Sequence, residues 1–164
     1  MRIKNDPRYT QIAILLCLVG LGATLFQVNI TFSQLSLSVI TALLSQYGFS
    51  LAYEKSFDWR SPLITGLSLS LLLRMNDPLW AVIAAFIAIS SKFILRAPQR
   101  HIVNPANFAI VVLLLCGAEI WVSPGQWGSG WVMGLFLVVL GVSVLTQTRQ
   151  WDIAFVFLVF YAVL

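Results

Sequence analysis

Charge is scarce in this sequence: Asp, Glu, Lys and Arg together make up 10% of its 164 residues, whereas a soluble globular domain carries about 25%. Cysteine and histidine are also rare, with two Cys and one His. Two isolated cysteines form neither a disulfide framework nor a metal cluster, and a single histidine excludes the usual multi-histidine metal and haem sites. The glycine motifs that bind nucleotide phosphates are absent as well. The sequence therefore argues against a soluble domain and against the common nucleotide-binding enzymes.

Hydrophobic residues are correspondingly abundant: they make up 59% of the chain, and the mean hydropathy is +0.89. This composition also excludes an intrinsically disordered chain, which needs low hydrophobicity and high charge. A membrane-spanning helix needs about 20 largely apolar residues. Apolar runs cover residues 12–28, 35–53, 63–73, 79–95, 108–123, 131–148 and 153–164. We therefore predict an all-α fold, a polytopic bundle of six to seven transmembrane helices that forms a single integral membrane domain over residues 1–164.

The first apolar run can also be interpreted as a signal peptide, because Arg2, Lys4 and Arg8 precede it. A signal peptide has an apolar stretch of about 7–15 residues that ends at a small-residue cleavage site. The run at 12–28 is longer, no such site closes it, and further apolar runs follow. These features favour a first transmembrane helix over a signal peptide.

The basic residues predict how the chain is oriented in the bilayer, because cytoplasmic loops of membrane proteins are enriched in Lys and Arg. If the first six runs each cross the membrane, nine of the ten basic residues fall on the side of the N-terminus: Arg2, Lys4, Arg8, Lys55, Arg60, Lys92, Arg96, Arg100 and Arg149. Only Arg74 falls on the other side. We therefore predict a cytoplasmic N-terminus. The basic residues stand singly between apolar runs, so the expected partner is the lipid bilayer and not nucleic acid.

Two of the apolar runs are shorter than a span. The run at 63–73 ends at a polar turn before Pro78, and short or proline-interrupted apolar segments indicate discontinuous helices in transporter-like folds. The alternative is a tilted or longer helix that begins near Trp59. The last run, 153–164, covers about 18 Å, against a hydrocarbon core of about 30 Å. We expect either a partial last helix or, preferably, a sequence that is the front part of a longer protein.

Two helix starts are indicated by a cap residue followed by a proline, which fits the first turn of a helix. Asn76 or Asp77 precedes Pro78, and Asn104 precedes Pro105. We expect the fourth and fifth helices to begin at these two places.

The helix start at Asn104 also has features of a binding site. A helix N-terminus offers backbone N–H groups and the positive end of a dipole, and the side chains of Asn104 and Asn107 add donors. Arg96 and Arg100, just before it, can pair with an anionic or phosphate-bearing group. The alternative is that the arginines only fix the topology and that Asn104 only caps the helix.

Two other features have competing interpretations. Glu119 is the only acidic residue predicted inside a span, where it is either an ion or proton site or a side chain that reaches the interface.

Asn104-Pro105-Ala106 spells the aquaporin triplet, but aquaporin-like proteins carry two copies, each opening a short half-helix. Here one copy is followed by about sixteen apolar residues, which argues against that family.

The stretch from Ser61 to Val111 resembles a known family of membrane proteins. It contains, in order, Ser61, Thr65, the turn before Pro78, Trp80, Lys92 and the closing sequence Ile-Val-Asn-Pro-Ala-Asn-Phe at 102–108. This pattern resembles the RnfD/NqrB family, whose members are integral membrane components of the Rnf electron-transport complex and of the sodium-pumping NADH:quinone reductase. The resemblance covers about a third of the chain.

The resemblance implies a fold of about ten helices in two inverted repeats, similar to urea-channel architecture, of which this chain would form a part. It also implies a flavin, FMN or riboflavin, and the residues expected to bind it are Thr65, Lys92, Asn104 and Asn107. Established members attach FMN to the Thr of a Ser-Gly-Ala-Thr motif, which this chain lacks; its Ser129-Gly130 continues with Trp131. Either the motif lies beyond Leu164, or the protein is a divergent relative without covalent FMN.

The function implied by the resemblance is that of a membrane subunit in a flavin-dependent electron-transport complex of the bacterial inner membrane. Its partners would be other subunits of the complex, and coupling to ion transport is left open. We expect no catalytic residue and no metal site, so the chain would be a flavin-carrying or non-catalytic subunit of an oxidoreductase. The alternatives are a small-solute transporter or channel of inverted-repeat architecture, and a structural subunit without a site of its own.

Overall fold

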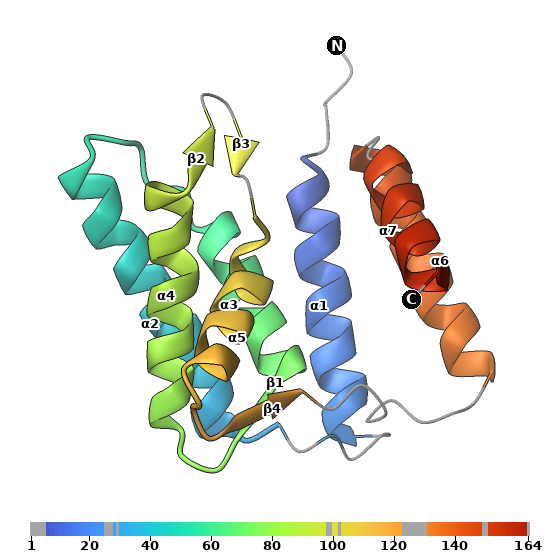
Figure 1. Cartoon of the computed structure of the whole chain (residues 1–164), viewed down its shortest axis with the longest axis horizontal. Helices are drawn as coiled ribbons and strands as arrows, with labels where there is room; N and C mark the ends of the chain where they lie inside the picture. Colours follow the sequence, from blue (N-terminus) through green and yellow to red (C-terminus); the bar gives the residue numbers. More distant parts are fainter. Residues whose placement is uncertain are drawn as a thin grey trace.

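The computed structural model describes residues 6–24, 28, 30–97, 100–101, 103–122, 131–148 and 151–163, without the side chains of residues 96, 97, 100, 101, 132, 133, 148, 153 and 157. Within these residues the chain forms seven helices and four short strands (Figure 1): α1 Pro7–Thr24, α2 Phe32–Ala52, α3 Arg60–Leu72, β1 Leu73–Met75, α4 Leu79–Ile94, β2 Arg96–Ala97, β3 Arg100–His101, α5 Pro105–Leu115, β4 Ile120–Val122, α6 Trp131–Thr148 and α7 Trp151–Val163. The strands have only two or three residues each. The predicted all-α class is therefore confirmed.

The core of the protein lies between α2, α3, α4 and α5, which pack against one another. α4 contributes small side chains to it, because Ala84, Ala85 and Ala88 are fully buried. Small residues let neighbouring helices approach closely. Gly66 on α3 has the same effect, since a Cβ added to it would lie 2.8 Å from the Cα of Val39 on α2. This close packing fixes the position of α3, which carries much of the site described below.

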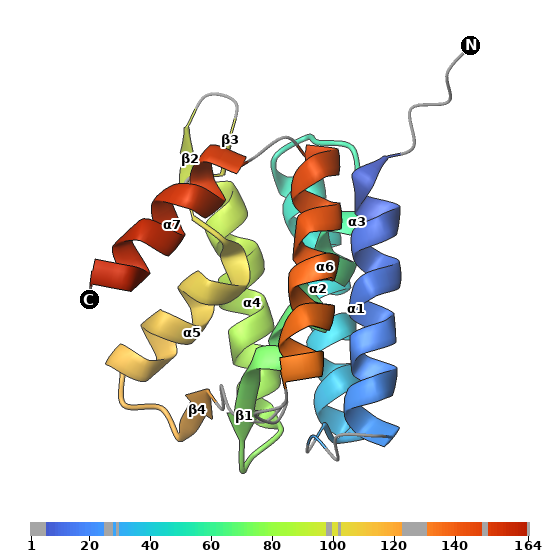
Figure 2. The same cartoon turned by 90° about the vertical axis from the view of Figure 1, so that its right-hand side faces the viewer.

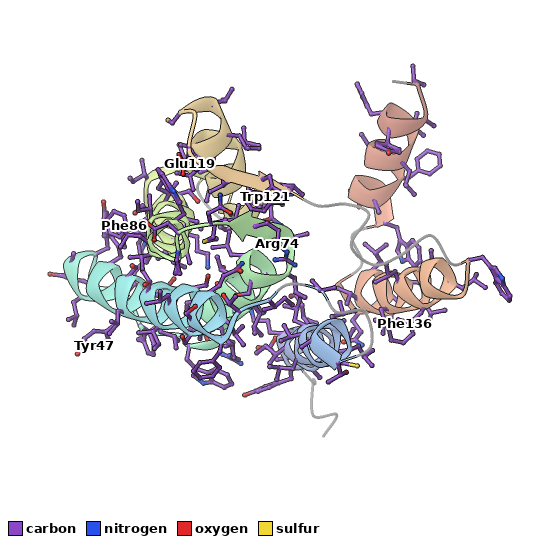
Figure 3. The ribbon with its side chains drawn as sticks, turned by 90° about the horizontal axis from the view of Figure 1, so that it is seen from below. Tyr47, Arg74, Phe86, Glu119, Trp121 and Phe136 are labelled. Atoms are coloured by element: carbon purple, nitrogen blue, oxygen red, sulfur yellow. The ribbon has the colours of Figure 1, made fainter. Side chains whose placement is uncertain are left out.

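The other three helices lie outside this core. α1 packs along α3, and α6 lies beside α1, whereas α7 diverges from α6 (Figure 2). Seen from below, α7 projects away from the rest of the bundle (Figure 3). Its side chains of Phe155, Leu158 and Phe160 are 69%, 61% and 69% exposed. Little of the apolar surface of α7 is therefore buried within the described part of the chain.

Most helices lie where the apolar runs placed them. α6 has the predicted bounds, and α2, α4 and α7 differ from their runs by a few residues. α1 begins well before its run, at Pro7, because proline fits the first turn and Asp6 caps it. The Asp6 Oδ1 accepts a hydrogen bond from the backbone N–H of Arg8 at 3.0 Å. Polar residues can thus extend a helix beyond its apolar run.

Both helix starts indicated by proline are confirmed. Asn104 caps α5, because its Oδ1 accepts hydrogen bonds from the backbone N–H groups of Ala106 (3.1 Å) and Asn107 (3.3 Å). The Asp77 Oδ1 accepts a hydrogen bond from the N–H of Leu79 (2.9 Å), the residue at which α4 begins. In both cases a short polar side chain satisfies N–H groups that have no partner inside the helix.

The short third apolar run, 63–73, forms α3. Of its two interpretations, a discontinuous helix and a longer helix that begins near Trp59, each is partly correct. The helix begins next to Trp59, as the alternative proposed. Its 13 residues nevertheless cover only about 20 Å at about 1.5 Å per residue, less than a bilayer core of about 30 Å. The chain then continues as the extended strand β1, so α3 is a short helix that ends inside the molecule.

Arg74, the middle residue of β1, closes the C-terminal end of α3. Its side chain is buried and donates hydrogen bonds to carbonyl oxygens at the helix end: Nη1 to Ser70 (2.9 Å) and Leu73 (2.7 Å), and Nη2 to Leu71 (3.1 Å). The last carbonyl groups of a helix have no partner within it, and the negative end of the helix dipole favours a cation. The side chain predicted to lie in an outer loop is therefore folded inward (Figure 3).

The fifth helix is shorter than predicted. α5 ends at Leu115 and not near residue 123, and the chain turns at Gly117, whose φ of 72° suits glycine. It then forms β4, which pairs antiparallel with β1. Glu119 lies in an exposed turn before β4, so the prediction that it lies within the fifth helix is wrong, whereas its alternative place at the interface stays a prediction (Figure 3). The prediction of a long helix after the Asn104-Pro105-Ala106 triplet is also wrong, because α5 ends at Leu115.

α2 is the one helix among the described residues whose length and hydropathy both meet the criterion for a membrane span. Shorter apolar helical segments accompany it at Leu79–Ile94, Pro105–Leu115, Gly134–Gln147 and Ala154–Val163. The criterion is thus met once within the described residues, and the polytopic bundle of six to seven membrane crossings stays a prediction.

Candidate functional site

A pocket of about 470 Å³ lies where the first residues of α1, α3 and α5 meet the last turn of α4. Its polar lining consists mainly of Arg8, Gln11, Ser61, Thr65, Lys92 and Asn104. Small-molecule sites in proteins measure about 300–1,000 Å³, so the volume is sufficient for a ligand. We call this cavity the polar pocket.

Lys92 is the buried cation of the polar pocket, with 5% of the residue exposed. Its Nζ donates hydrogen bonds to Thr65 Oγ1 (2.8 Å), Ser61 Oγ (3.1 Å) and Ser61 O (3.3 Å). The Thr65 hydroxyl in turn donates to the carbonyl oxygen of Ser61 at 3.0 Å. The i, i+4 spacing of Ser61 and Thr65 puts both hydroxyls on one face of α3, where the lysine from α4 reaches them. Neutral oxygens therefore engage the donors of the ammonium group.

The charge of Lys92 has no ion-pair partner among the described residues. Lys92 also meets α3 near its N-terminus, where the positive end of the helix dipole disfavours a cation. A buried cation held by neutral oxygens alone is costly, and an anion in the pocket would offset part of that cost. The polar pocket is therefore suited to a negatively charged or electron-rich ligand.

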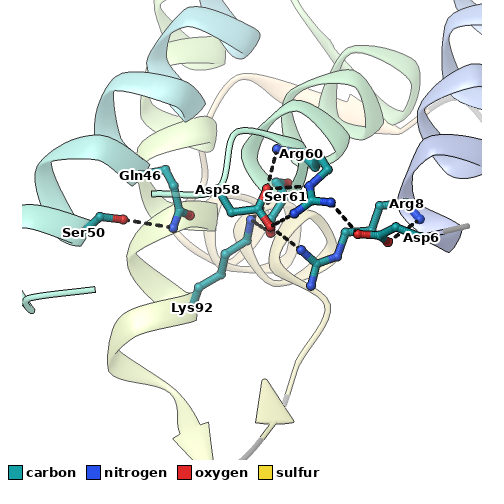
Figure 4. A network of polar contacts seen from close by, with 8 residues as sticks. All are labelled: Asp6, Arg8, Gln46, Ser50, Asp58, Arg60, Ser61 and Lys92. Atoms are coloured by element: carbon teal, nitrogen blue, oxygen red, sulfur yellow. Dashed lines mark hydrogen bonds and ion pairs between the residues drawn. The ribbon is translucent and has the colours of Figure 1, made fainter. Parts of the chain in front are cut away.

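Four charged residues join the start of α1 to the loop before α3 (Figure 4). Arg60 donates to Asp6 (Nη1 to Oδ2, 2.6 Å) and to Asp58 (Nε to Oδ1, 2.8 Å), and Arg8 also donates to Asp58. The hydrogen bond from the Arg60 side chain is the main reason that the pKa of Asp58 lies below its ordinary value. These side chains are partly exposed, so each pair stabilises the fold by only about 0–1 kcal/mol. The network nevertheless positions Arg8 at the polar pocket.

A smaller cavity of about 170 Å³ shares Arg8, Ser61 and Lys92 with the polar pocket. Gln46 also lines it, and the Nε2 of Gln46 donates a weak hydrogen bond to Ser50 Oγ at 3.5 Å. The Gln46 Oε1 is buried and has no hydrogen-bond partner among the described residues. A buried acceptor without a partner indicates a place for a donor such as a ligand N–H or a water molecule.

The structure brings together three of the four residues expected to bind a cofactor. Thr65, Lys92 and Asn104 all line the polar pocket. Asn107 does not line it and is exposed on α5. The Asn104 Oδ1 already accepts from two backbone N–H groups of α5, so those two groups are not free for a ligand, contrary to the expectation for this helix start.

Arg96 and Arg100 were expected as contacts for a phosphate-bearing group. Their backbone lies in the β2–β3 hairpin that follows α4, with Arg96 opposite His101 and Ala97 opposite Arg100. Their side chains lie outside the described part of the chain, so the expectation remains a prediction.

Sequence reasoning missed Arg8, Gln11 and Gln46 as site residues. Arg8 counted only as a topology signal, because its place at the pocket depends on how α1 approaches α3. For the α3 side of the pocket the sequence does contain a signal, because Ser61 and Thr65 share one helical face within a mostly apolar segment.

No family model, curated protein or solved structure matches this chain.

Proposed function

We propose that the protein is an integral membrane subunit of an RnfD/NqrB-like, flavin-dependent electron-transport complex, and that the polar pocket binds the flavin. One observation carries the proposal: Thr65, Lys92 and Asn104, which the family resemblance singles out, line one pocket from α3, α4 and the start of α5. Other subunits of the complex would deliver and remove electrons.

The surface of the protein supports a position in the bilayer. Large apolar side chains are exposed on several helices, among them Leu44 (65%), Leu79 (60%) and Leu115 (83%). Exposed apolar surface on this scale marks contact with lipid or with other proteins. The charged network of Asp6, Arg8, Asp58 and Arg60 lies at the starts of α1 and α3, and Figure 1 shows these helix starts at the opposite end of the bundle from β1. We place this network at the cytoplasmic face of the bacterial inner membrane, with the helices forming part of an inverted-repeat bundle.

The residues of the polar pocket fit a flavin. The Lys92 amino group provides hydrogen-bond donors beside the cavity, and Arg8 can pair with the phosphate of FMN. The unpartnered Gln46 Oε1 in the adjoining cavity can accept from a ring N–H. A bound flavin would supply the redox chemistry, while these residues supply position and electrostatics.

The test measures flavin in the full chain purified in detergent, by absorbance and by fluorescence of the flavin released on denaturation. We expect flavin in the wild type. Lys92→Met and Thr65→Val should retain it about tenfold less well, because a hydrogen bond to a charged group contributes about 1.5–3 kcal/mol.

Thr146→Val is the matched control for Thr65→Val. Thr146 also donates to a carbonyl group one helical turn earlier, that of Val142, at 3.0 Å, but it lies on α6. We expect Thr146→Val to retain flavin. A wild-type protein without flavin, or equal retention by Thr65→Val and Thr146→Val, would exclude the polar pocket as the flavin site.

A small-solute transporter or channel is the second candidate, and one feature favours it. α3 and α5 are shorter than a span, and each leads into a strand, β1 or β4, that pairs with the other. Discontinuous helices form the substrate sites of many transporters. Solute uptake by vesicles that contain only this protein would support this function, whereas a requirement for partner subunits would favour the electron-transport subunit.

A further inference from the structure

A serine hydroxyl lies within reach of the buried amino group of Lys92. The Ser61 Oγ is 3.1 Å from the Lys92 Nζ, and Figure 4 shows the lysine of α4 extending toward this serine at the start of α3. A hydroxyl group next to a base is the arrangement that activates a nucleophile, and serine–lysine pairs are one known form of it. We call Ser61 and Lys92 the serine–lysine pair.

The contacts around the Lys92 Nζ suit a neutral amine, which has two N–H donors and one lone pair. Thr65 Oγ1 (2.8 Å) and the carbonyl oxygen of Ser61 (3.3 Å) can accept from the two donors, and the lone pair can then accept from the Ser61 hydroxyl. Burial of the lysine and the nearby N-terminus of α3 both disfavour an ammonium group. Buried lysines serve as general bases in other proteins, and Lys92 is placed to do so toward Ser61.

Ser61, and not Thr65, is placed as the nucleophile. Thr65 is 5% exposed, and its hydroxyl already donates to the carbonyl oxygen of Ser61 at 3.0 Å. Ser61 is half-buried and lines both the polar pocket and the smaller cavity. Within the described part of the chain, its hydroxyl has Lys92 as its one hydrogen-bond partner. Thr65 therefore positions the amine, and Ser61 faces the space that a substrate can enter.

Asn104 brings an amide group to the same pocket. Its Oδ1 is engaged by two backbone N–H groups of α5, so the amide Nδ2 is the end that can donate to a ligand. Asparagine side chains stabilise the negative oxygen that develops during acyl transfer in several enzymes. The polar pocket thus combines a nucleophile, a base and an amide donor around about 470 Å³, which is sufficient for a small substrate.

We propose that Ser61 and Lys92 form a catalytic pair that hydrolyses small carboxylic esters in the polar pocket. The Ser61 Oγ attacks the carbonyl carbon while the Lys92 Nζ takes the hydroxyl proton. The bond to the alcohol oxygen then breaks, and Nζ gives its proton to that oxygen, which leaves an acyl group on Ser61. Water hydrolyses this acyl group with the same amine as base, and both side chains are restored. The activity goes beyond the flavin site proposed above and does not depend on it.

Diisopropyl fluorophosphate tests the pair in the full chain purified in detergent, because it reacts with activated serines. An Oγ–P bond forms, the P–F bond breaks, fluoride leaves, and the Lys92 Nζ takes the proton. Any flavin is first measured and then removed by dialysis against potassium bromide, since the pocket holds one ligand at a time. We expect mass spectrometry to find the label on Ser61, and we expect the wild type to hydrolyse 4-nitrophenyl acetate.

Variants of the pair separate catalysis from the binding of an anion. Ser61→Ala should abolish both labelling and hydrolysis. Lys92→Met should slow both at least about a hundredfold, the contribution of a general base. Lys92→Arg should be equally slow, because a guanidinium group can pair with an anion but cannot accept a proton. Thr65→Val should slow the reaction, and Thr65→Ser should restore it, because the hydroxyl positions the amine.

Ser70→Ala is the matched control. Ser70 also lies on α3 and, like Thr65, donates to a carbonyl group one turn earlier, that of Gly66 at 2.9 Å, but it does not line the polar pocket. We expect this variant to be labelled like the wild type. Thermal unfolding identifies a variant that does not fold, and Lys92→Gln then replaces Lys92→Met.

Three results would overturn the proposal: a wild type without label on Ser61, full labelling of Lys92→Arg, or a label on Ser68. Ser68 lines the polar pocket but forms no hydrogen bond with Lys92 among the described residues. The flavin content of the same samples keeps the two proposals apart. Labelling without flavin would support the serine–lysine pair alone, and flavin without labelling would support the flavin site alone.

Discussion

Two buried cations meet α3 at its opposite ends, and each is held by oxygen atoms of the helix and not by a carboxylate. Lys92 contacts Ser61 and Thr65 near the first turn, and Arg74 contacts carbonyl groups at the last turn. The helix dipole favours a cation at the second position and disfavours one at the first. Arg74 therefore stabilises the fold, whereas Lys92 occupies a place that the helix dipole disfavours, which is consistent with the anionic ligand proposed for the polar pocket.

We expect Arg74→Gln to lower the free energy of unfolding by about 1–3 kcal/mol, the cost of one buried carbonyl left without a partner, because the Leu73 carbonyl keeps its hydrogen bond from Gln34. Arg74→Lys should recover only part of this loss, since an ammonium group lacks the planar arrangement of donors that reaches several carbonyls at once. Denaturant unfolding in detergent measures both variants. A loss smaller than about 1 kcal/mol for Arg74→Gln would show that the helix end does not depend on this side chain.

Asp58 makes a contribution to stability that depends on pH. Its pKa lies below the ordinary value of 3.8, chiefly because the Arg60 side chain donates a hydrogen bond to it. A carboxyl whose pKa is lowered by folding stabilises the fold above its unfolded-state pKa, and this stabilisation disappears as the pH falls through the folded-state pKa.

Below pH 3.8 we therefore expect the unfolding midpoint of the wild type to fall more steeply with decreasing pH than that of Asp58→Asn. Thermal unfolding in detergent from pH 6 to about pH 2.5 measures the difference, which should shrink at about 1 M salt because the ion pairs are partly exposed. Parallel curves for the two proteins would contradict a role for this carboxylate.

At the scale of elements, hydrophobicity predicted the long helices well and the short elements poorly. The uniform apolar run at 131–148 became α6 with the same bounds. The run at 108–123 instead contains a helix, a turn at Gly117 and a strand, because a count of apolar residues does not distinguish short helices from short strands. The β1–β4 pair gave no signal, since its strands have three residues each and their partners are remote in sequence.

The candidate site was predictable only where one element carries the pattern. The cap at Asn104 and the polar face of Ser61 and Thr65 are local features, and the sequence shows them. The position of Arg8 depends on ion pairs with the loop before α3, which no local pattern records. The same holds for Gln46, since the burial of its Oε1 follows from the packing of α2 on its neighbours.

Gly117 is required by the turn between α5 and β4, where its φ is 72°. A Cβ at this position would meet nothing within 4 Å, so the cost of Gly117→Ala comes from the backbone alone and should be about 1–2 kcal/mol. Gly134→Ala is the control: it is equally open but helical, and we expect it to stabilise α6 by up to about 1 kcal/mol. Denaturant unfolding in detergent measures both variants. Equal changes in their free energy of unfolding would contradict this explanation of the turn.

At the scale of the whole molecule, the two ends differ in chemistry. One end carries the starts of α1 and α3 with their charged network and the β2–β3 hairpin, and the other carries the β1–β4 pair (Figure 1). Loops rich in basic residues remain in the cytoplasm when a membrane protein is inserted. The orientation proposed here follows from that asymmetry.

Cysteine labelling tests this orientation after Cys17 and Cys116 are replaced by serine. A membrane-impermeant maleimide added to intact cells should label Asn76→Cys and should not label Lys55→Cys, since the two residues lie at opposite ends of the bundle. Both should be labelled after the cells are opened. Labelling of Lys55→Cys in intact cells would overturn the topology and every proposal that depends on it.

The antiparallel pairing of Leu73 with Val122 and of Met75 with Ile120 has a consequence for biosynthesis. During translation β1 leaves the ribosome long before β4, and contacts between remote segments form late. In the membrane arrangement proposed above, the end of α3 would enter the bilayer with an open strand edge that closes only after α4 and α5 have been inserted. A chaperone or insertase that shields this edge would act in the interval between the synthesis of the third helix and that of the fifth.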